Sequence, residues 1–301
     1  MYYTKQPLSF EQQADLLIKR GLIISDKDIL IERLKNVNYT RLSAYWHTFQ
    51  DVNNNYNFLP GTQLDTIWQR YLFDHELRLI VMDAIGYVEV AILRTRTVEQ
   101  FTLKHGPFGY TQKSNFGSHF TDEKYAEMIK EINKVVTDRK NRDETVQEYF
   151  KTYHGETYLP LWMLVEFLSF GTLFTLFRHI NDFEKKTIAR QLGLSDDVLQ
   201  SWLLSLNYSR NLCAHHDRLW NRELGVRPVT PRKMPEWTSL ILHANNRVFV
   251  TLTTLNYLTK KICPEIKWDS RVKNLLKSFP EIPINQMMGF PNNWSESSLW
   301  K

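Results

Sequence analysis

The residues best suited to chemistry stand in one run, residues 207–222, where Arg210 is followed by Asn211 and then by His215. A guanidinium is a rigid forked donor that grips a phosphate at two oxygens, and an imidazole moves a proton near neutral pH. On a helix that turns about 100° per residue, Asn211 and His215 share a face because they are four positions apart. The run therefore predicts a catalytic site, made of these three residues, for a phosphate ester.

An arginine and a histidine together suit the cleavage of RNA by its own 2′-hydroxyl group. The histidine would take or give the proton, and the arginine would stabilise the charge that develops on the phosphoryl oxygens. This reaction needs no metal and no cofactor, so we expect neither. It does need both an acid and a base, which one histidine does not easily supply in one step. A second copy in a homodimer is a natural source of the other group, and His216 competes with His215 within the chain.

The helix that carries the run has its apolar residues on the same side as Arg210. Four of them lie within about 80° of Arg210 around the helix axis: Leu199, Trp202, Leu203 and Leu206. Because an unpaired buried charge is very costly, Arg210 should have a partner or a groove. Glu89, which lies with Arg94 in a long predicted helix, is the first candidate for that partner. The alternative is a helix break at residues 207–209, with Ser209 capping a new turn.

A basic segment follows the run and predicts contacts with an RNA backbone. Its RNA-binding candidates are His216, Arg218, Arg222, Arg227, Arg232 and Lys233. Trp220 would be a stacking platform or, as we favour, part of the core, and Cys213 also favours core packing. A zinc site is a poorer alternative because the chain lacks the paired spacing of zinc ligands. Its ligands would be Cys213, His215, His216 and either His243 or Cys263.

The composition limits the class of protein. The 301 residues carry a net charge of +5, which fits a polyanionic partner such as RNA. Only 11 glycines and 11 prolines are present, fewer than a fold with many tight β-turns needs. Two cysteines are typical of a cytoplasmic chain, and residues 1–10 lack the apolar run of a signal peptide. The most apolar stretch, residues 161–177, is interrupted by polar residues and predicts a buried helix, with no membrane contact.

The spacing of apolar residues predicts an all-α protein. We expect a small N-terminal helical module at residues 1–58, a helical bundle at 59–262, and a short helix with a tail at 263–301. The predicted helices cover residues 9–20, 26–37, 38–49, 64–104, 125–142, 143–153, 161–177, 182–192, 196–216, 237–261 and 270–279.

Two further groups of polar residues favour a structural interpretation. The lysines and arginines at residues 125–142 should form a solvated helix face. Asn38, Tyr39, Arg41 and Tyr45 would bind a base or, as we favour, pack the small N-terminal module.

Several stretches of the chain resemble one known family. The run SLNYSRNLCAHHDRLWNREL is similar to the signature of the bacterial abortive-infection AbiD/AbiF family of Abi-like proteins. The spacing of Arg210 and His215 matches the Arg-x4-His motif of the HEPN superfamily. Similar family stretches correspond to KQPLSFEQQADLLIKRGL, NYTRLSAYW, YLFDHELRLI, VEVAILRTR and EFLSFGTLFTLF.

The resemblance implies a HEPN-like helical bundle that dimerises around the motif, phage defence by abortive infection, and association with a small structured noncoding RNA. On the family's motif, Arg210 would contact the scissile phosphate, and Asn211 would orient the histidine or the phosphate. His215 would be the acid or base.

Three functions remain open from the sequence. The first is a metal-independent endoribonuclease, and the second is a non-catalytic HEPN RNA-binding module. The third is a toxin–antitoxin-like interaction protein in which the charged cluster is structural. RNA binding separates the third function from the other two. Loss of cleavage with retained RNA affinity in His215→Ala separates the first from the second.

Overall fold

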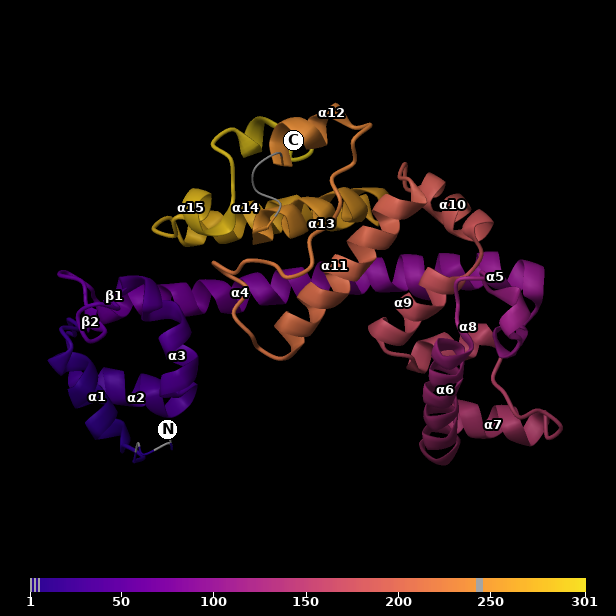
Figure 1. Cartoon of the computed structure of the whole chain (residues 1–301), viewed down its shortest axis with the longest axis horizontal. Coiled ribbons are helices and arrows are strands. Elements are labelled where there is room, and N and C mark those ends of the chain that lie inside the picture. Colours follow the sequence, from indigo (N-terminus) through magenta and orange to yellow (C-terminus); the bar gives the residue numbers. More distant parts are fainter. Residues whose placement is uncertain (1, 3, 5, 242–245) are drawn as a thin grey trace. The chain divides into compact units, whose positions relative to one another are not determined.

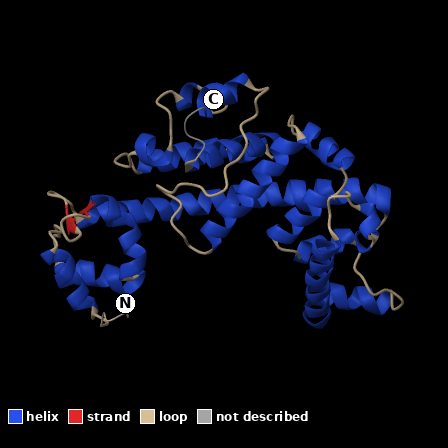
Figure 2. Cartoon of the chain, in the orientation of Figure 1, coloured by secondary structure: helices blue, strands red, loops and turns tan. Residues whose placement is uncertain are grey.

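A computed structural model describes residues 2, 4, 6–241 and 246–301. Helices dominate it (Figure 2), and in that part of the chain the only strands are the short antiparallel pair β1 (Gln50–Asp51) and β2 (Asn57–Phe58). The prediction of an all-α protein is therefore confirmed. Short 3-10 turns lie at His47–Phe49, Gly109–Thr111, Lys113–Asn115, Val165–Phe167, Pro264–Ile266 and Trp294–Glu296.

The chain packs as two compact units. The N-terminal unit contains Met1–Arg78 and Lys273–Ile282, and the main unit contains Leu79–Val272 and Pro283–Lys301. The helix α4 (Leu64–Val88) begins in the N-terminal unit and ends in the main unit. The domain boundaries that we expect at residues 58/59 and 262/263 refer to units that fold independently. They stay a prediction.

The N-terminal unit contains α1 (Phe10–Lys19), α2 (Lys27–Val37) and α3 (Tyr39–Trp46), followed by the β1–β2 hairpin. Ser9 and Gln12 form the capping box that the sequence predicts, since each side chain accepts the backbone N–H of the other residue. Gly21 follows α1 with a φ of 91°, a conformation that favours glycine. Ile23, between α1 and α2, forms a parallel bridge with Gln63, which follows the hairpin.

Three buried side chains hold α3 in the N-terminal unit: Leu42, Tyr45 and Trp46. The Tyr45 hydroxyl donates to Asp74 Oδ2 at 2.6 Å, and Asp74 is ion-paired with Arg78 on the next turn of α4. Burial and the neighbouring carboxylate raise the pKa of Tyr45, so its hydroxyl keeps its proton. The prediction that Tyr45 packs the small module is confirmed.

The main unit continues α4 through a π-helical segment, η2 (Glu89–Arg96). Its other helices are α5 (Thr97–His105), α6 (Asp122–Arg142), α7 (Glu144–Thr152), α8 (Leu161–Leu164), α9 (Phe170–His179), α10 (Asp182–Gln191), α11 (Asp196–Ala214), α12 (Pro235–Ile241), α13 (Val248–Ile262), α14 (Trp268–Ser278, shared with the N-terminal unit) and α15 (Ile284–Met288). The long helix predicted at residues 64–104 is confirmed as α4, η2 and α5 in sequence. The basic side chains of α6 are exposed, as predicted: Lys130, Lys134, Arg139, Lys140 and Arg142.

The apolar stretch at residues 161–177 is not the single helix that we expected. It is mostly buried, but the backbone is extended at Leu168, and α9 starts afresh after it. The Ser169 hydroxyl accepts the Thr172 N–H at 3.2 Å and so begins the new helix. No helix of the described residues is long and apolar enough to cross a membrane.

The helix predicted at residues 237–261 is also divided. The structure describes α12 as far as Ile241, and α13 begins at Val248 after extended backbone at Arg247. Residues 242–245 lie outside the described part of the chain.

Candidate functional site

The helix α11 carries Arg210 and Asn211 near its C-terminal end. Its apolar stripe is buried as predicted, with Leu199, Trp202, Leu203 and Leu206 all inaccessible to solvent. It packs against α9, α10 and α13 in the main unit (Figure 1). The alternative of a break at residues 207–209 is wrong, because α11 is continuous from Asp196 to Ala214 and Ser209 is buried within it.

The helix ends within the run rather than after it. The Asp217 N–H donates to the Leu212 carbonyl at 2.8 Å, and the His216 N–H donates to the Cys213 carbonyl at 3.0 Å. This pair of bonds is the Schellman arrangement that closes a helix. It makes His215 the first residue beyond the helix, and it gives His216 a φ of 57°, where glycine is usual.

The three predicted catalytic residues all lie in the last turns of this helix or at its cap, and the structure shows a contact between Arg210 and Asn211. Asn211 and His215 are both exposed, and Arg210 is half-buried. Nη1 of Arg210 donates to Oδ1 of Asn211 at 3.3 Å. The helix end therefore presents a guanidinium and an amide that are hydrogen-bonded to each other, and an imidazole four residues after the amide at the helix cap.

The predicted pairing of Arg210 with Glu89 is wrong. Glu89 pairs instead with Arg94, whose Nη2 lies 2.5 Å from the Glu89 Oε1 and whose Nε lies 3.1 Å from it. The π-helical segment explains this pairing. In an α-helix, the side chains of two residues five apart point about 140° away from each other around the helix axis. In a π-helix, the backbone hydrogen bonds join residues five apart, so their side chains lie close together.

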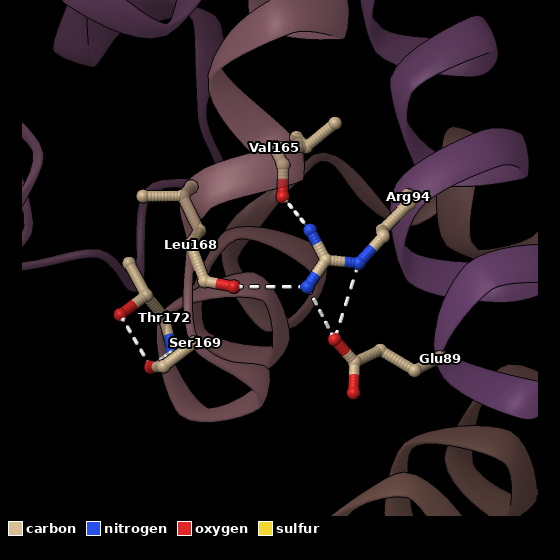
Figure 3. A network of polar contacts seen from close by, with 6 residues as sticks. All are labelled: Glu89, Arg94, Val165, Leu168, Ser169 and Thr172. Atoms are coloured by element: carbon tan, nitrogen blue, oxygen red, sulfur yellow. Dashed lines mark hydrogen bonds and ion pairs between the residues drawn. The ribbon is translucent and has the colours of Figure 1, made fainter. Parts of the chain in front are cut away.

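Arg94 also satisfies the backbone where the apolar stretch breaks. Its guanidinium donates to the carbonyl of Val165 and, at 3.0 Å, to the carbonyl of Leu168 (Figure 3). These carbonyls belong to the 3-10 turn and the extended residue that separate α8 from α9. Glu89 and Arg94 are thus a structural pair that joins η2 to the α8–α9 junction.

The basic segment after the run turns back along α11. The Trp202 Nε1 donates to the Val229 carbonyl at 2.9 Å, and the Val229 N–H donates to the Ser201 hydroxyl at 2.9 Å. One turn further along α11, the Ser205 hydroxyl donates to the Val226 carbonyl at 3.2 Å. These bonds place the segment beside the helix that carries Arg210.

The predicted RNA-binding residues divide into two groups. Near the helix end, Nη1 of Arg222 donates to the Arg218 carbonyl at 3.1 Å and lies 4.0 Å from the Asp217 carboxylate. Both of these arginines are half-buried, whereas His216 is exposed. The second group lies on the returning segment and is exposed: Arg227, Arg232 and Lys233.

Two residues of the run belong to the core, as favoured from the sequence. Trp220 has no accessible surface and cannot be a stacking platform in this conformation. Cys213 is buried at 4% exposure. No group of three or more metal-ligating side chains occurs among residues 2, 4, 6–241 and 246–301, and His243 of the zinc alternative lies outside them.

One basic residue near the site was missed from the sequence. Arg247, just before α13, donates to Asn221 Oδ1 at 3.1 Å and pairs with Glu223 at 3.2 Å. The Leu224 N–H donates to the Asn246 carbonyl at 2.8 Å and ties the same two segments together. No spacing in the sequence signals this contact, because it joins two irregular segments.

The arrangement can bind a phosphate ester at a solvent-exposed position. The Arg210 donors not used by Asn211 can meet phosphate oxygens, and the exposed His215 can exchange a proton with a ligand there. The returning segment adds exposed cations along the same helix, which suits a polyanion longer than one nucleotide.

Comparison with known proteins gives one match. The family model of the Abi-like proteins matches residues 32–221, which is more than half of the chain and includes both the Glu89–Arg94 pair and the run at residues 207–221. No curated protein and no solved structure matches the chain. On the extent of that match, the chain belongs to the Abi-like protein family.

Proposed function

We propose that this Abi-like protein is an RNA-binding defence protein of the cytoplasm and a metal-independent endoribonuclease of the HEPN type. Family membership implies the role in abortive infection, and the proposal concerns the chemistry. Its catalytic residues would be Arg210, Asn211 and His215.

The observation that carries the proposal is the solvent-accessible C-terminal end of α11. In the described part of the chain, Arg210 has a single side-chain hydrogen bond, to Asn211, which leaves most of its five donors for a ligand. His215 is exposed at the first position beyond the helix, four residues after Asn211. His216 is a poorer candidate for the acid or base, because the backbone of that residue forms the closing turn.

In the proposed reaction the 2′-oxygen of a ribose attacks the adjacent phosphorus, and the bond from phosphorus to the 5′-oxygen breaks. The 2′-hydroxyl loses its proton to a base, and the departing 5′-oxygen gains a proton from an acid. The products are a 2′,3′-cyclic phosphate and a 5′-hydroxyl end. Arg210 would stabilise the charge on the non-bridging oxygens, and Asn211 would hold the guanidinium in place.

His215 supplies one of the two proton-transfer groups. A second copy of the chain in a homodimer would supply the other, since one imidazole does not serve both roles within one step. The exposed residues of the returning segment would hold the RNA, whether a substrate or a small structured noncoding RNA: Arg227, Arg232 and Lys233.

The test compares the wild-type protein with His215→Ala and with a matched variant, His154→Ala, which removes another exposed histidine. The probe is a 5′-labelled, mixed-sequence single-stranded RNA, incubated with EDTA. We expect His215→Ala to cut the RNA at least ~100-fold more slowly, with affinity within about threefold of wild type. His154→Ala should behave as wild type, and the product should carry a 2′,3′-cyclic phosphate.

Two outcomes decide against the nuclease. Cleavage of a fully 2′-O-methylated RNA would exclude attack by the 2′-hydroxyl. Unchanged cleavage and cellular toxicity in His215→Ala would exclude His215 as acid or base. RNA that is bound but not cut by the wild-type protein would instead support the non-catalytic RNA-binding module.

A further inference from the structure

A groove lined by aromatic side chains, the aromatic groove, lies between α7 and α8 in the main unit. It consists of two adjacent hollows, of about 540 and 330 Å³, which share Tyr149, Tyr153 and Met163. Its other aromatic side chains are those of Phe108 and Trp162. The helix α7 lies at the periphery of the main unit (Figure 1). Hollows of this size can take a side chain or a short segment of a ligand.

The aromatic side chains of the groove are open to solvent. Trp162 is 52% exposed and Tyr153 is 56% exposed. The ring of Tyr149 lies beside that of Tyr153, with the centroids 5.0 Å apart. Several large aromatic side chains on one open face are typical of a binding surface, because burying them against a partner is favourable.

Hydrogen bonds hold the loop between α7 and α8 in place. The Tyr149 hydroxyl donates to the Tyr158 carbonyl at 3.2 Å and ties the loop to α7. The hydroxyl of the buried Tyr110 donates to the Leu159 carbonyl at 2.7 Å and ties the loop to the segment after α5. Because its wall is anchored in this way, the groove needs little ordering of the chain to bind a ligand.

The aromatic groove is acidic, although the chain as a whole is basic. Among the described residues that line the two hollows, none is a lysine or arginine and three are glutamates: Glu144, Glu148 and Glu156. Residues 143–166 contain five acidic residues and one lysine, whereas the whole chain has a net charge of +5. That lysine, Lys151, lies 3.9 Å from Glu148, but both side chains are 73% exposed, so the pair is weak. The groove therefore favours a cation over the phosphates of a nucleic acid.

The carboxylate of Glu156 belongs to the aromatic part of the groove. It lines the same hollow as Trp162. Burial, and then the neighbouring Glu156 and Tyr153, raise the pKa of Tyr149. An arginine side chain suits both features, because its planar guanidinium stacks on aromatic rings while its N–H donors pair with a carboxylate.

We propose that the aromatic groove binds an arginine-bearing segment of a partner protein, with a guanidinium stacked on the aromatic rings and paired with the glutamates. The acidic charge of the groove is complementary to such a segment, and the two joined hollows suit more than one side chain of it. This binding is separate from the proposed RNA cleavage. It uses residues of α7, α8 and the adjoining loops, whereas the proposed catalytic residues lie at the end of α11.

The test measures, by fluorescence anisotropy, how the full-length protein binds a labelled peptide of alternating arginine and glycine residues. The salt concentration is about 0.15 M, at which charges far from the groove are screened. We expect Trp162→Ala to weaken binding about fivefold and Glu156→Lys to weaken it at least ~10-fold. The same peptide with neutral citrulline in place of arginine should bind at least ~10-fold more weakly to the wild-type protein.

The matched controls remove an aromatic ring and reverse an acidic charge elsewhere in the main unit. Phe183 on α10 is 70% exposed, and Glu127 on α6 is exposed. Neither residue lines the groove. Phe183→Ala and Glu127→Lys should bind the peptide within about twofold of wild type. Thermal unfolding verifies that all four variants fold.

Four results would overturn the proposal of an arginine-binding groove. The first two are no peptide binding by the wild-type protein and equal binding of the arginine and citrulline peptides. The third is equal weakening in Trp162→Ala and Phe183→Ala. The fourth is a loss of RNA binding or of self-association in Trp162→Ala, which would assign the groove to RNA or to a second copy of the chain. The two functions fail separately: His215→Ala should bind the peptide normally, and Trp162→Ala should cut RNA at the wild-type rate.

Discussion

Two arginines of the main unit, Arg94 and Arg210, show how differently one side chain is used. The Arg94 side chain is 14% exposed, and its guanidinium meets a carboxylate and two backbone carbonyls. Arg210 is half-buried and donates to one neighbouring amide. A guanidinium with its donors occupied by the protein stabilises the fold, whereas one with donors to spare at an open helix end is available to a ligand.

The largest expected effect follows from removing Arg94, whose donors are bonded to other groups of the protein. We expect Arg94→Ala to lower the free energy of unfolding by about 4 kcal/mol, because it leaves the half-buried Glu89 carboxylate and two carbonyls without their donor. Arg210→Ala should change it by less than about 0.5 kcal/mol, as surface substitutions usually do. Urea denaturation of both variants measures the difference. Equal losses in the two variants would mean that Arg210 is structural too.

The second prediction contrasts a buried histidine with the exposed ones of the site. His179 is 4% exposed and stacks on Phe120 with ring centroids 3.9 Å apart. Burial, and then the neighbouring His119 and basic groups, lower the pKa of His179 to about 4. As the pH falls, His179 therefore becomes protonated near pH 6.5 in the unfolded chain but only near pH 4 in the folded chain.

The contribution of His179 to the free energy of unfolding should thus be fully present above about pH 6.5. It should fall as the pH is lowered toward 4, by at most about 3 kcal/mol. Denaturation curves between pH 7 and pH 4 measure it. His179→Phe keeps the ring stack, removes the titrating group and should flatten the curve. The exposed-histidine variant His154→Ala is the control and should keep the wild-type slope. A wild-type slope in His179→Phe would contradict the assignment.

The smallest expected effect distinguishes the roles of His215 and His216, the two histidines of the run. His216 has a φ of 57°, a conformation that glycine adopts at least cost. We expect His216→Gly to be more stable than His216→Ala by about 1 kcal/mol, measured by thermal unfolding. If His215 is the acid or base, His216→Gly should also keep RNA cleavage, because it preserves the closing turn. Loss of cleavage in the glycine variant would transfer the role to His216.

The helical parts of the fold were largely predictable, because apolar spacing and helix caps are local signals. The capping box at Ser9 and the buried stripe of α11 are examples. The divided helices were not foreseen, since Ser169 caps α9 inside a stretch that is apolar enough to continue. The partner of Glu89 was misassigned for a related reason. Residues five apart face different sides of an α-helix, and only the π-helical segment stacks Glu89 on Arg94.

The sequence by itself determined that the chain is helical and that Arg210, Asn211 and His215 form one short motif, because helical periodicity and motif spacing are properties of neighbouring residues. The tertiary structure decided which arginine is occupied and which is available. It also decided where the basic segment runs, along α11, and how α3 is anchored to α4. These outcomes depend on contacts between residues far apart in the chain, for which no local pattern exists.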